Sequence, residues 1–497
     1  MIEAFYSMPE PKPSKKLSLF DVTNLVIGAI IGADIYVASS FGAGFLGPFS
    51  LVVWVVAGLI AIVIALCFAQ CVMLLPKVGG PYAYAKRAWG PFAGFIVGWS
   101  LWLAEWISLA VFPLAFTRYL MFFVPNMNVV TQSLVKVVFV AFLALTNIVG
   151  IKAAGKVNDV LTLLKLAPLV FFVIAGITWI FINPVVASAN FSPFAPFGFA
   201  GFGSAIVLIF WAYAGFEIST IPAEDVEEPS KNIPKAVIIG ILVVTVFYLT
   251  TNVVLFAVRN YNQLATDTAP LAAASNGILS SNVTLALLGG LLVGIGALIS
   301  VAGSDESGMI GTARLGYALA ADGLFPKIFA KIHTKFKTPY ASIIIQSITA
   351  LAAALLAPFF GGLNLLISVS VFFLAIAYLA TSASVFPLHK KNPVSNVHYG
   401  KRNAVIPVLG VVFSIYLITQ CSLSQISVGI LLLLVGIPIY IKYSPKKELT
   451  EVKQSLLSEQ NIFRRMHRQE HVFLANIIHH LGIYYRRRMR KPKRKQT

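Results

Sequence analysis

The sequence predicts an all-α integral membrane protein with about twelve membrane-spanning helices, and three observations support this fold class. Of 497 residues, 58% are hydrophobic and 11% are charged, with a mean hydropathy of +0.83. That composition is far too apolar for a soluble chain of this length. Apolar stretches of about 20 residues, the length that crosses a bilayer core, follow one another with short polar gaps. Finally, basic residues gather in alternate loops.

The apolar stretches set the order of the predicted spans. We expect them at roughly 19–46, 48–75, 90–124, 132–150, 157–182, 200–223, 234–258, 285–318, 339–358, 361–388, 403–421 and 424–443. The first stretch has no small-residue cleavage site, so it should remain as a span and not be removed as a signal peptide. Residues 1–18 then form an N-terminal segment, residues 19–443 a twelve-helix domain and residues 444–497 a basic tail.

The basic loops predict the orientation in the membrane, because lysine and arginine favour cytoplasmic loops. These residues are Lys77, Lys86 and Arg87; Lys152 and Lys156; Lys231 and Lys235; Lys327, Lys331, Lys335 and Lys337; and Lys390, Lys391, Lys401 and Arg402. The intervening loops carry almost none, so we expect both termini in the cytoplasm. The net charge of +19 follows this loop pattern and not one soluble face, which argues against a nucleic acid partner.

Glycines predict interruptions in the first and sixth spans. The first contains Gly28 and Gly32, and the sixth contains Ala214-Gly215 followed by Pro222. Irregular backbone is stable in a membrane only where it is buried in protein or lines a cavity. Broken helices at equivalent positions are typical of two five-helix repeats of inverted topology, with a site between them whose half-helix ends suit a zwitterion. Close helix packing is the alternative explanation for these glycines.

Asp34, Lys165 and Glu105 are ionisable residues that lie deep within predicted spans, where each needs a partner. Asp34 lies about 27 Å of helix beyond Lys16, and Lys165 about 13 Å beyond Lys156. Asp34 could pair with a cationic substrate or cap the second half-helix. Glu105 in the third span could line a cavity or hydrogen-bond to another span. Lys165 could have a functional role, or it could pair with a carbonyl group and serve helix packing alone.

The tail at residues 444–497 is strongly basic and ends in Arg490-Lys491-Pro492-Lys493-Arg494-Lys495. Its apolar residues Phe463, Met466, Phe473 and Ile477 recur at helical spacing. Two interpretations stay open: an amphipathic helix on anionic lipids of the inner leaflet, or a solvated basic tail.

Enzyme signatures do not occur in the sequence. It contains no P-loop and no H-E-x-x-H motif, and His333, His389 and His398 lie in basic loops without ligand spacing. We therefore expect neither an enzyme nor a metal or cofactor site, and no ATP-driven pumping by this chain.

Four short segments share one family resemblance, which covers roughly residues 17–443. They are Leu75-Pro76-Lys77-Val78-Gly79-Gly80-Pro81-Tyr82-Ala83-Tyr84 with Gly98-Trp99; Gly28-Ala29-Ile30-Ile31-Gly32; Trp211-Ala212-Tyr213-Ala214-Gly215-Phe216-Glu217 with Glu227-Glu228-Pro229 and Ile233-Pro234; and Arg314 with Asp322-Gly323-Leu324-Phe325-Pro326 and Thr338-Pro339. These segments resemble the amino acid, polyamine and organocation transporters. The resemblance implies a LeuT-like fold and secondary active transport of amino acids by alternating access, and we expect the plasma (cell) membrane as its location.

The resemblance also implies the residues of the site. The substrate ammonium would meet backbone carbonyls of Ile30, Trp211, Ala212 and Ala214, and its carboxylate would meet amides at Gly32, Ala33 and Asp34. Trp211 could close over the substrate as an aromatic gate. Asp34 departs from the family pattern, because relatives carry a second glycine there. Glu105 resembles the acid of a Glu-aromatic pair, with its spacing from Gly98-Trp99 shifted by one.

Lys165 stands where sodium-driven members of the resembled family bind sodium, which implies proton coupling without sodium. Among transporters, the alternative is a polyamine, organocation or cationic amino acid carrier or exchanger, favoured by Asp34. A membrane receptor that senses amino acids and signals through the basic tail is a further alternative. The acidic residues Glu217, Glu224, Asp225, Glu227 and Glu228 are expected at an inner gate or in loop contacts with basic residues.

Overall fold

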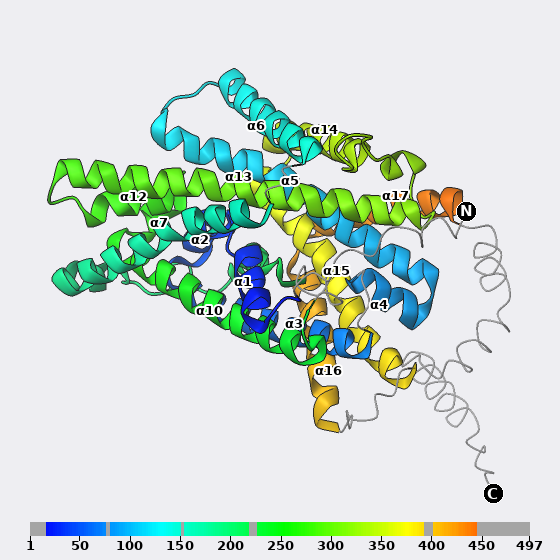
Figure 1. Ribbon diagram of the computed structural model, residues 1–497. Helices are drawn as coiled ribbons and strands as arrows, with labels where there is room; N and C mark the ends of the chain where they lie inside the picture. Colours follow the sequence, from blue (N-terminus) through cyan, green and yellow to red (C-terminus); the bar gives the residue numbers. More distant parts are fainter. Residues whose placement is uncertain (1–15, 76–79, 151–153, 218–225, 392–400, 445–497) are drawn as a thin grey trace, which may run out of the picture.

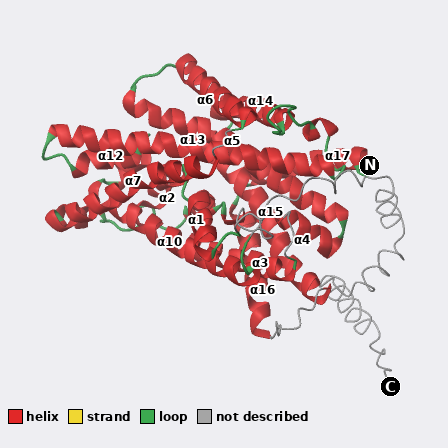
Figure 2. Ribbon diagram, in the orientation of Figure 1, coloured by secondary structure: helices red, strands yellow, loops and turns green. Residues whose placement is uncertain are grey.

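The computed structural model describes residues 16–75, 80–150, 154–217, 226–391 and 401–444 (Figure 1). Most of the predicted N-terminal segment and nearly all of the basic tail therefore lie outside the described residues, as do Lys77, Lys152, Glu224 and Asp225. The described residues form helices joined by turns and loops (Figure 2), with a single isolated β-bridge between Leu17 and Val226. The predicted all-α class is confirmed for them.

A helix occurs at the place of every predicted span. The α-helices are α1 (Leu19–Ile30), α2 (Asp34–Leu46), α3 (Ser50–Leu74), α4 (Gly80–Trp89), α5 (Pro91–Phe123), α6 (Val129–Val149), α7 (Ala154–Ile182), α8 (Pro184–Asn190), α9 (Phe202–Phe210), α10 (Pro229–Val258), α11 (Tyr261–Thr266), α12 (Pro270–Ile278), α13 (Val283–Ala321), α14 (Tyr340–Leu356), α15 (Gly362–Lys391), α16 (Lys401–Gln420) and α17 (Leu423–Tyr443). Short 3₁₀ helices include η3 (Trp211–Tyr213) and η7 (Ala357–Phe359). Nine segments of the described residues are long and apolar enough to cross a membrane, and three shorter apolar helices accompany them.

Local sequence explains where several helices begin. Ser18 and Asp21 form a capping box at the start of α1, and Ser422 and Gln425 form another at the start of α17. The Asn128 side chain accepts a hydrogen bond from the backbone of Thr131 and caps α6. These caps satisfy backbone N–H groups that lack partners within the first helical turn.

The helices pack around α5, α13 and α15. Helix α5 contacts α13, α14 and α15, while α10 contacts α1 and α3. Figure 1 shows α6 and α14 along one side of α13, with α1, α3 and α10 on the other. This arrangement buries the middle of α5, where Glu105 lies, inside the helix bundle.

Two of the motifs behind the family resemblance meet at one end of the bundle. The Tyr82 hydroxyl donates to the Asp322 carboxylate, and Lys86 Nζ lies 3.1 Å from the same carboxylate. Both side chains of the ion pair are roughly two-fifths exposed, at 41% and 44%, so the pair contributes little energy. The ion pair mainly fixes the position of the helices, because it joins the last turn of α4 to the end of α13.

Glycine permits the close packing of α3 against α10. A Cβ atom at Gly58 would lie 2.6 Å from Thr245 Oγ1 and 2.8 Å from Thr245 Cγ2. Neither distance leaves room for a side chain, so this contact depends on glycine.

We predict that Gly58→Val lowers the stability of the folded protein by about 1–3 kcal/mol, because it overpacks the α3–α10 contact. Gly311→Val is the matched control, since nothing lies within 4 Å of a Cβ at Gly311. Thermal melting of both purified variants in detergent is the measurement. Equal melting temperatures for the two variants would contradict the packing argument.

Candidate functional site

The first predicted interruption lies between α1 and α2. Helix α1 ends at Ile30, Ile31 takes an extended conformation, and α2 begins at Asp34. The Ile30 carbonyl accepts a hydrogen bond of 3.0 Å from the Tyr248 hydroxyl. The side chains of Ile30 and Ala33 are fully buried, so this irregular backbone lies inside protein, as the membrane requires.

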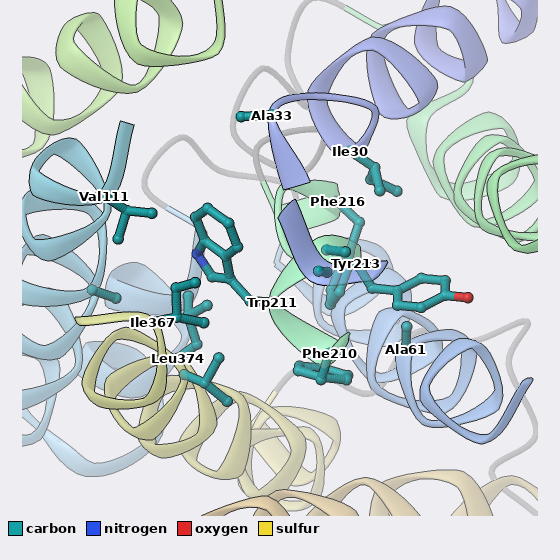
Figure 3. Packing of buried hydrophobic residues seen from close by; sticks show 14 of the residues in the cluster. Ile30, Ala33, Ala61, Val111, Phe210, Trp211, Tyr213, Phe216, Ile367 and Leu374 are labelled. Carbon is teal, nitrogen blue, oxygen red and sulfur yellow. The ribbon is translucent and has the colours of Figure 1, made fainter. Parts of the chain in front are cut away.

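The second predicted interruption follows α9 and η3. Ala214 is extended, and Gly215 has a φ of +117°, a conformation that favours glycine. A Cβ atom at Gly215 would lie 2.6 Å from the Ala29 carbonyl oxygen. The two helix breaks are therefore in direct backbone contact, and Figure 3 shows Ile30 and Ala33 beside the segment that carries Trp211 and Phe216.

Trp211 points away from its own helix toward α5 and α15, near Val111 and Ile367 (Figure 3). Its Nε1 donates to Ser108 Oγ at 3.3 Å, and its ring centroid lies 6.0 Å from that of Phe112. Tyr213 points to the opposite side, where its hydroxyl donates to the Trp54 carbonyl at 2.8 Å. The Trp211 side chain is thus positioned between the second break and α5.

A short hydroxyl chain extends this contact. Ser108 Oγ and Ser370 Oγ lie 3.0 Å apart, and both hydroxyls lie within hydrogen-bond distance of the Ala104 carbonyl. These groups join Trp211 to the backbone of α5 one residue before Glu105. Among the described residues, this chain of hydroxyl groups connects the second break, α5 and α15.

Three carboxylates from separate segments lie near the breaks. Glu105 on α5 interacts electrostatically with both Asp34 and Glu217. Glu217 Oε2 accepts hydrogen bonds from the Gly215 amide at 3.0 Å and from the Tyr378 hydroxyl at 3.1 Å. The structure therefore brings together Asp34 and Glu105, which the sequence singled out, and adds Glu217.

The acidic residues around the sixth span lie in two different environments. Glu228 pairs with Lys231 at 2.8 Å on the surface, as expected of a loop contact, and the Lys231 hydrogen bond lowers the pKa of Glu228. Glu217 is 5% exposed and accepts from the backbone at the second break, and its role at an inner gate stays a prediction.

Lys165 reaches the same region from α7. It is 8% exposed, and a Cβ atom at Gly303 of α13 would lie 3.0 Å from its Nζ atom. Its electrostatic partners are Asp34 and Glu306. Next along α13, Ser304 Oγ lies 2.6 Å from where a Gly32 Cβ would stand, so α13 connects Lys165 with the first break.

Asp34 is not at the N-cap position of α2, because it is the first residue of the helix and Ala33 is the N-cap. Its carboxylate nevertheless interacts with its own backbone N–H in the first turn, where it also faces the positive end of the helix dipole and the positive charge of Lys165. A capping role for Asp34 and a role in pairing with a cationic substrate both stay predictions.

Sequence reasoning missed several polar groups at the site. Ser108, Ser370 and Tyr378 stand between apolar neighbours in apolar spans, and no local motif marks them. Ser304 begins the polar run Ser304-Asp305-Glu306-Ser307 inside the eighth predicted span. Their hydroxyls inside predicted spans were the available signal, because such groups need partners in a membrane. Within the described residues, no cluster of three or more His, Cys, Asp or Glu side chains could hold a metal ion.

Comparison with known proteins assigns the chain to a family. Residues 17–440 match the amino acid permease family. Among similar proteins, the branched-chain amino acid permease BcaP of Bacillus subtilis is 29% identical, over 88% of this chain and 94% of the relative. The methylthioribose transporter of the same organism is 30% identical over 88% and 95% of the two chains. The human large neutral amino acids transporter small subunit 2 is 28% identical over 86% and 80%.

These matches cover nearly all of the helical domain and include the helix breaks, the acidic residues near them and Lys165. The matched proteins are transporters, which agrees with the apolar helices of the described residues. This chain is therefore an integral membrane protein that belongs to the amino acid permease family, a family of transporters and not of enzymes.

Proposed function

We propose that this protein is a secondary active permease that moves an amino acid across the membrane by alternating access around the two helix breaks. One observation carries the proposal: Gly215 of the second break packs against the Ala29 carbonyl at the end of α1. Relatives named for branched-chain amino acids and large neutral amino acids support this substrate class.

The proposed topology has twelve crossings in a LeuT-like arrangement of inverted repeats. The pair α1–α2 forms the first crossing, and α9 with η3 begins the sixth. The three shorter apolar helices, Leu19–Ile30, Phe202–Tyr213 and Ala404–Gln420, supply parts of crossings that the length criterion alone does not count. The basic loops support cytoplasmic termini, and we place the protein in the plasma membrane.

The proposed substrate site uses the backbone at both breaks. Its ammonium group would meet the carbonyls of Ile30, Trp211, Ala212 and Ala214, and its carboxylate would meet the amides of Gly32, Ala33 and Asp34 at the start of α2. The Ile30 carbonyl already accepts from Tyr248, but a carbonyl oxygen has a second lone pair. Trp211 is the proposed aromatic gate because its side chain stands between the second break and α5.

Proton coupling without sodium is the proposed energy source. The ammonium of Lys165 lies against Gly303 and interacts with Asp34 at the first break. A charged lysine within a membrane span is costly unless it is paired, so a change in its charge would alter the stability of the Asp34 contact. Occupancy of the site could thereby be linked to proton transfer.

A cationic amino acid or polyamine is the second candidate substrate. Asp34, Glu105 and Glu217 give the region around the breaks three carboxylates, against one nearby ammonium from Lys165. Those carboxylates that are ionised would favour a substrate with a second positive group.

Uptake by proteoliposomes tests the transport proposal. Labelled neutral amino acids, basic amino acids and polyamines would be supplied with and without an imposed proton gradient, in sodium-free buffer. Gradient-driven uptake of neutral amino acids is expected. Preference for polyamines would favour the second candidate, and substrate binding without flux would contradict transport.

We predict that Asp34→Asn lowers uptake of basic amino acids and polyamines at least about tenfold relative to neutral amino acids, since it removes a carboxylate within the membrane interior. Glu306→Gln is the matched control, because Glu306 also interacts with Lys165 but lies on α13. Competition assays in proteoliposomes give the ratio. An unchanged ratio in Asp34→Asn would remove direct charge pairing as the basis of selectivity.

We predict that Lys165→Met abolishes proton-driven accumulation while leaving counterflow exchange within about threefold of the original chain, because exchange needs no net proton movement. Lys331→Met in an exposed loop is the control. Accumulation that persists in Lys165→Met, or that requires sodium in the unchanged chain, would contradict the coupling role.

A further inference from the structure

A small basic pocket lies away from the helix breaks, between the end of α5, the start of α6 and η7. Its volume is about 100 Å³, and its lining residues are Leu114, Thr117, Arg118, Met121, Gln132, Lys136 and Pro358. Arg118 comes from α5 and Lys136 from α6. The pocket thus holds two cations from neighbouring helices and no acidic residue.

Neither cation has a protein counterion in the part of the chain that the structure describes. The ion pairs there join Lys86 with Asp322, Lys231 with Glu228, and Arg259 with Asp267. Lys136 is 6% exposed. Arg118 is partly buried. Cations withdrawn from water are costly without a compensating anion, so the pocket favours an anionic occupant.

The other polar groups of the pocket already have acceptors. The Thr117 hydroxyl donates to the Pro113 carbonyl at 2.7 Å, and the Gln132 amide donates to the Met127 carbonyl at 2.8 Å. The guanidinium of Arg118 and the ammonium of Lys136 are therefore the donors left for an occupant. A guanidinium fork beside an ammonium is well suited to a phosphate group.

The depth of the pocket matches the level of lipid headgroups. Helix α5 has 33 residues and is about 50 Å long, roughly 20 Å more than the hydrocarbon core, so about 10 Å extends beyond the core at each end of a centred helix. Arg118 lies about 8 Å before the end of α5 at Phe123. Its position is thus close to the boundary between hydrocarbon and headgroups.

Exposed apolar residues adjoin the pocket. Phe359 follows the lining residue Pro358 and is 76% exposed, and Val129 lies two turns before Lys136 on the same face of α6 and is 74% exposed. An apolar surface at a basic pocket suits a molecule with an acyl chain and an anionic head. A free phosphate ion would gain nothing from this surface.

We propose that the pocket between α5, α6 and η7 binds the phosphate group of an anionic phospholipid through Arg118 and Lys136. The acyl chains contact the exposed apolar residues Val129 and Phe359 beside the pocket. This site is separate from the proposed substrate site and does not depend on the proposed transport function.

The test uses the full-length protein purified in detergent and a double variant, Arg118→Gln with Lys136→Gln. Phosphatidylglycerol, phosphatidylcholine and inorganic phosphate are titrated separately while the melting temperature is followed, and native mass spectrometry counts retained lipid. The control, Lys331→Gln with Lys335→Gln, removes two exposed loop cations and leaves the pocket unchanged. All variants keep the basic tail, so lipid binding by the tail is common to every arm.

Phosphatidylglycerol is expected to stabilise the unchanged chain and the control, with an apparent affinity at least about tenfold weaker, or about 1.4 kcal/mol, in the double variant. The single variant Arg118→Lys keeps the charge but loses the fork, and an intermediate affinity is expected for it. Equal affinity in the double variant overturns the site. Equal stabilisation by phosphatidylcholine overturns the preference for an anionic head, and equal stabilisation by inorganic phosphate overturns the lipid as the source of the phosphate.

Discussion

The close approach of Gly215 to the Ala29 carbonyl is the contact on which the rest of the site depends. The second break can approach the backbone of Ala29 this closely because Gly215 has no side chain, and Gly215 also takes a φ of +117°. Two side chains bind the backbone where these breaks meet. Tyr248 satisfies the Ile30 carbonyl at the end of α1, and Glu217 accepts from the Gly215 amide.

Charge at the breaks follows from the same geometry. Backbone at a helix break leaves N–H and C=O groups without helical partners, and the low dielectric of the membrane makes each unsatisfied group costly. Side chains supply part of the compensation: the Tyr248 hydroxyl of α10 donates to the Ile30 carbonyl, and the Glu217 carboxylate accepts from the Gly215 amide. The remaining groups face a region that combines carboxylates, an ammonium and irregular backbone, which suits a small zwitterion or cation better than an apolar ligand.

Sequence reasoning reached the fold more fully than the site. Apolar length predicts a helix at each expected span, and glycine placement marks both breaks, because each signal is local. The short helices α4, α8, α11 and α12 lie between these spans and were not predicted. Contacts between residues that are far apart in the sequence produce no local pattern of this kind. Ser108 and Ser370 are separated by 262 residues and meet only through the packing of α5 against α15. The sequence groups Glu217 with the acidic residues of a loop, because several acidic residues follow it in the chain. Tertiary packing nevertheless buries its side chain beside Tyr378.

Helix α5 links the helix breaks with the basic pocket. Glu105 and Arg118 are separated by about 20 Å of helix, and Pro113 lies between them and removes one backbone donor from the α5 ladder. Packing against α13 and α15 holds the middle of α5, whereas Arg118 lies near its end. A headgroup bound to Arg118 would fix that end relative to the membrane surface, so any tilt of α5 near Glu105 would have to bend the helix at Pro113 or release the lipid.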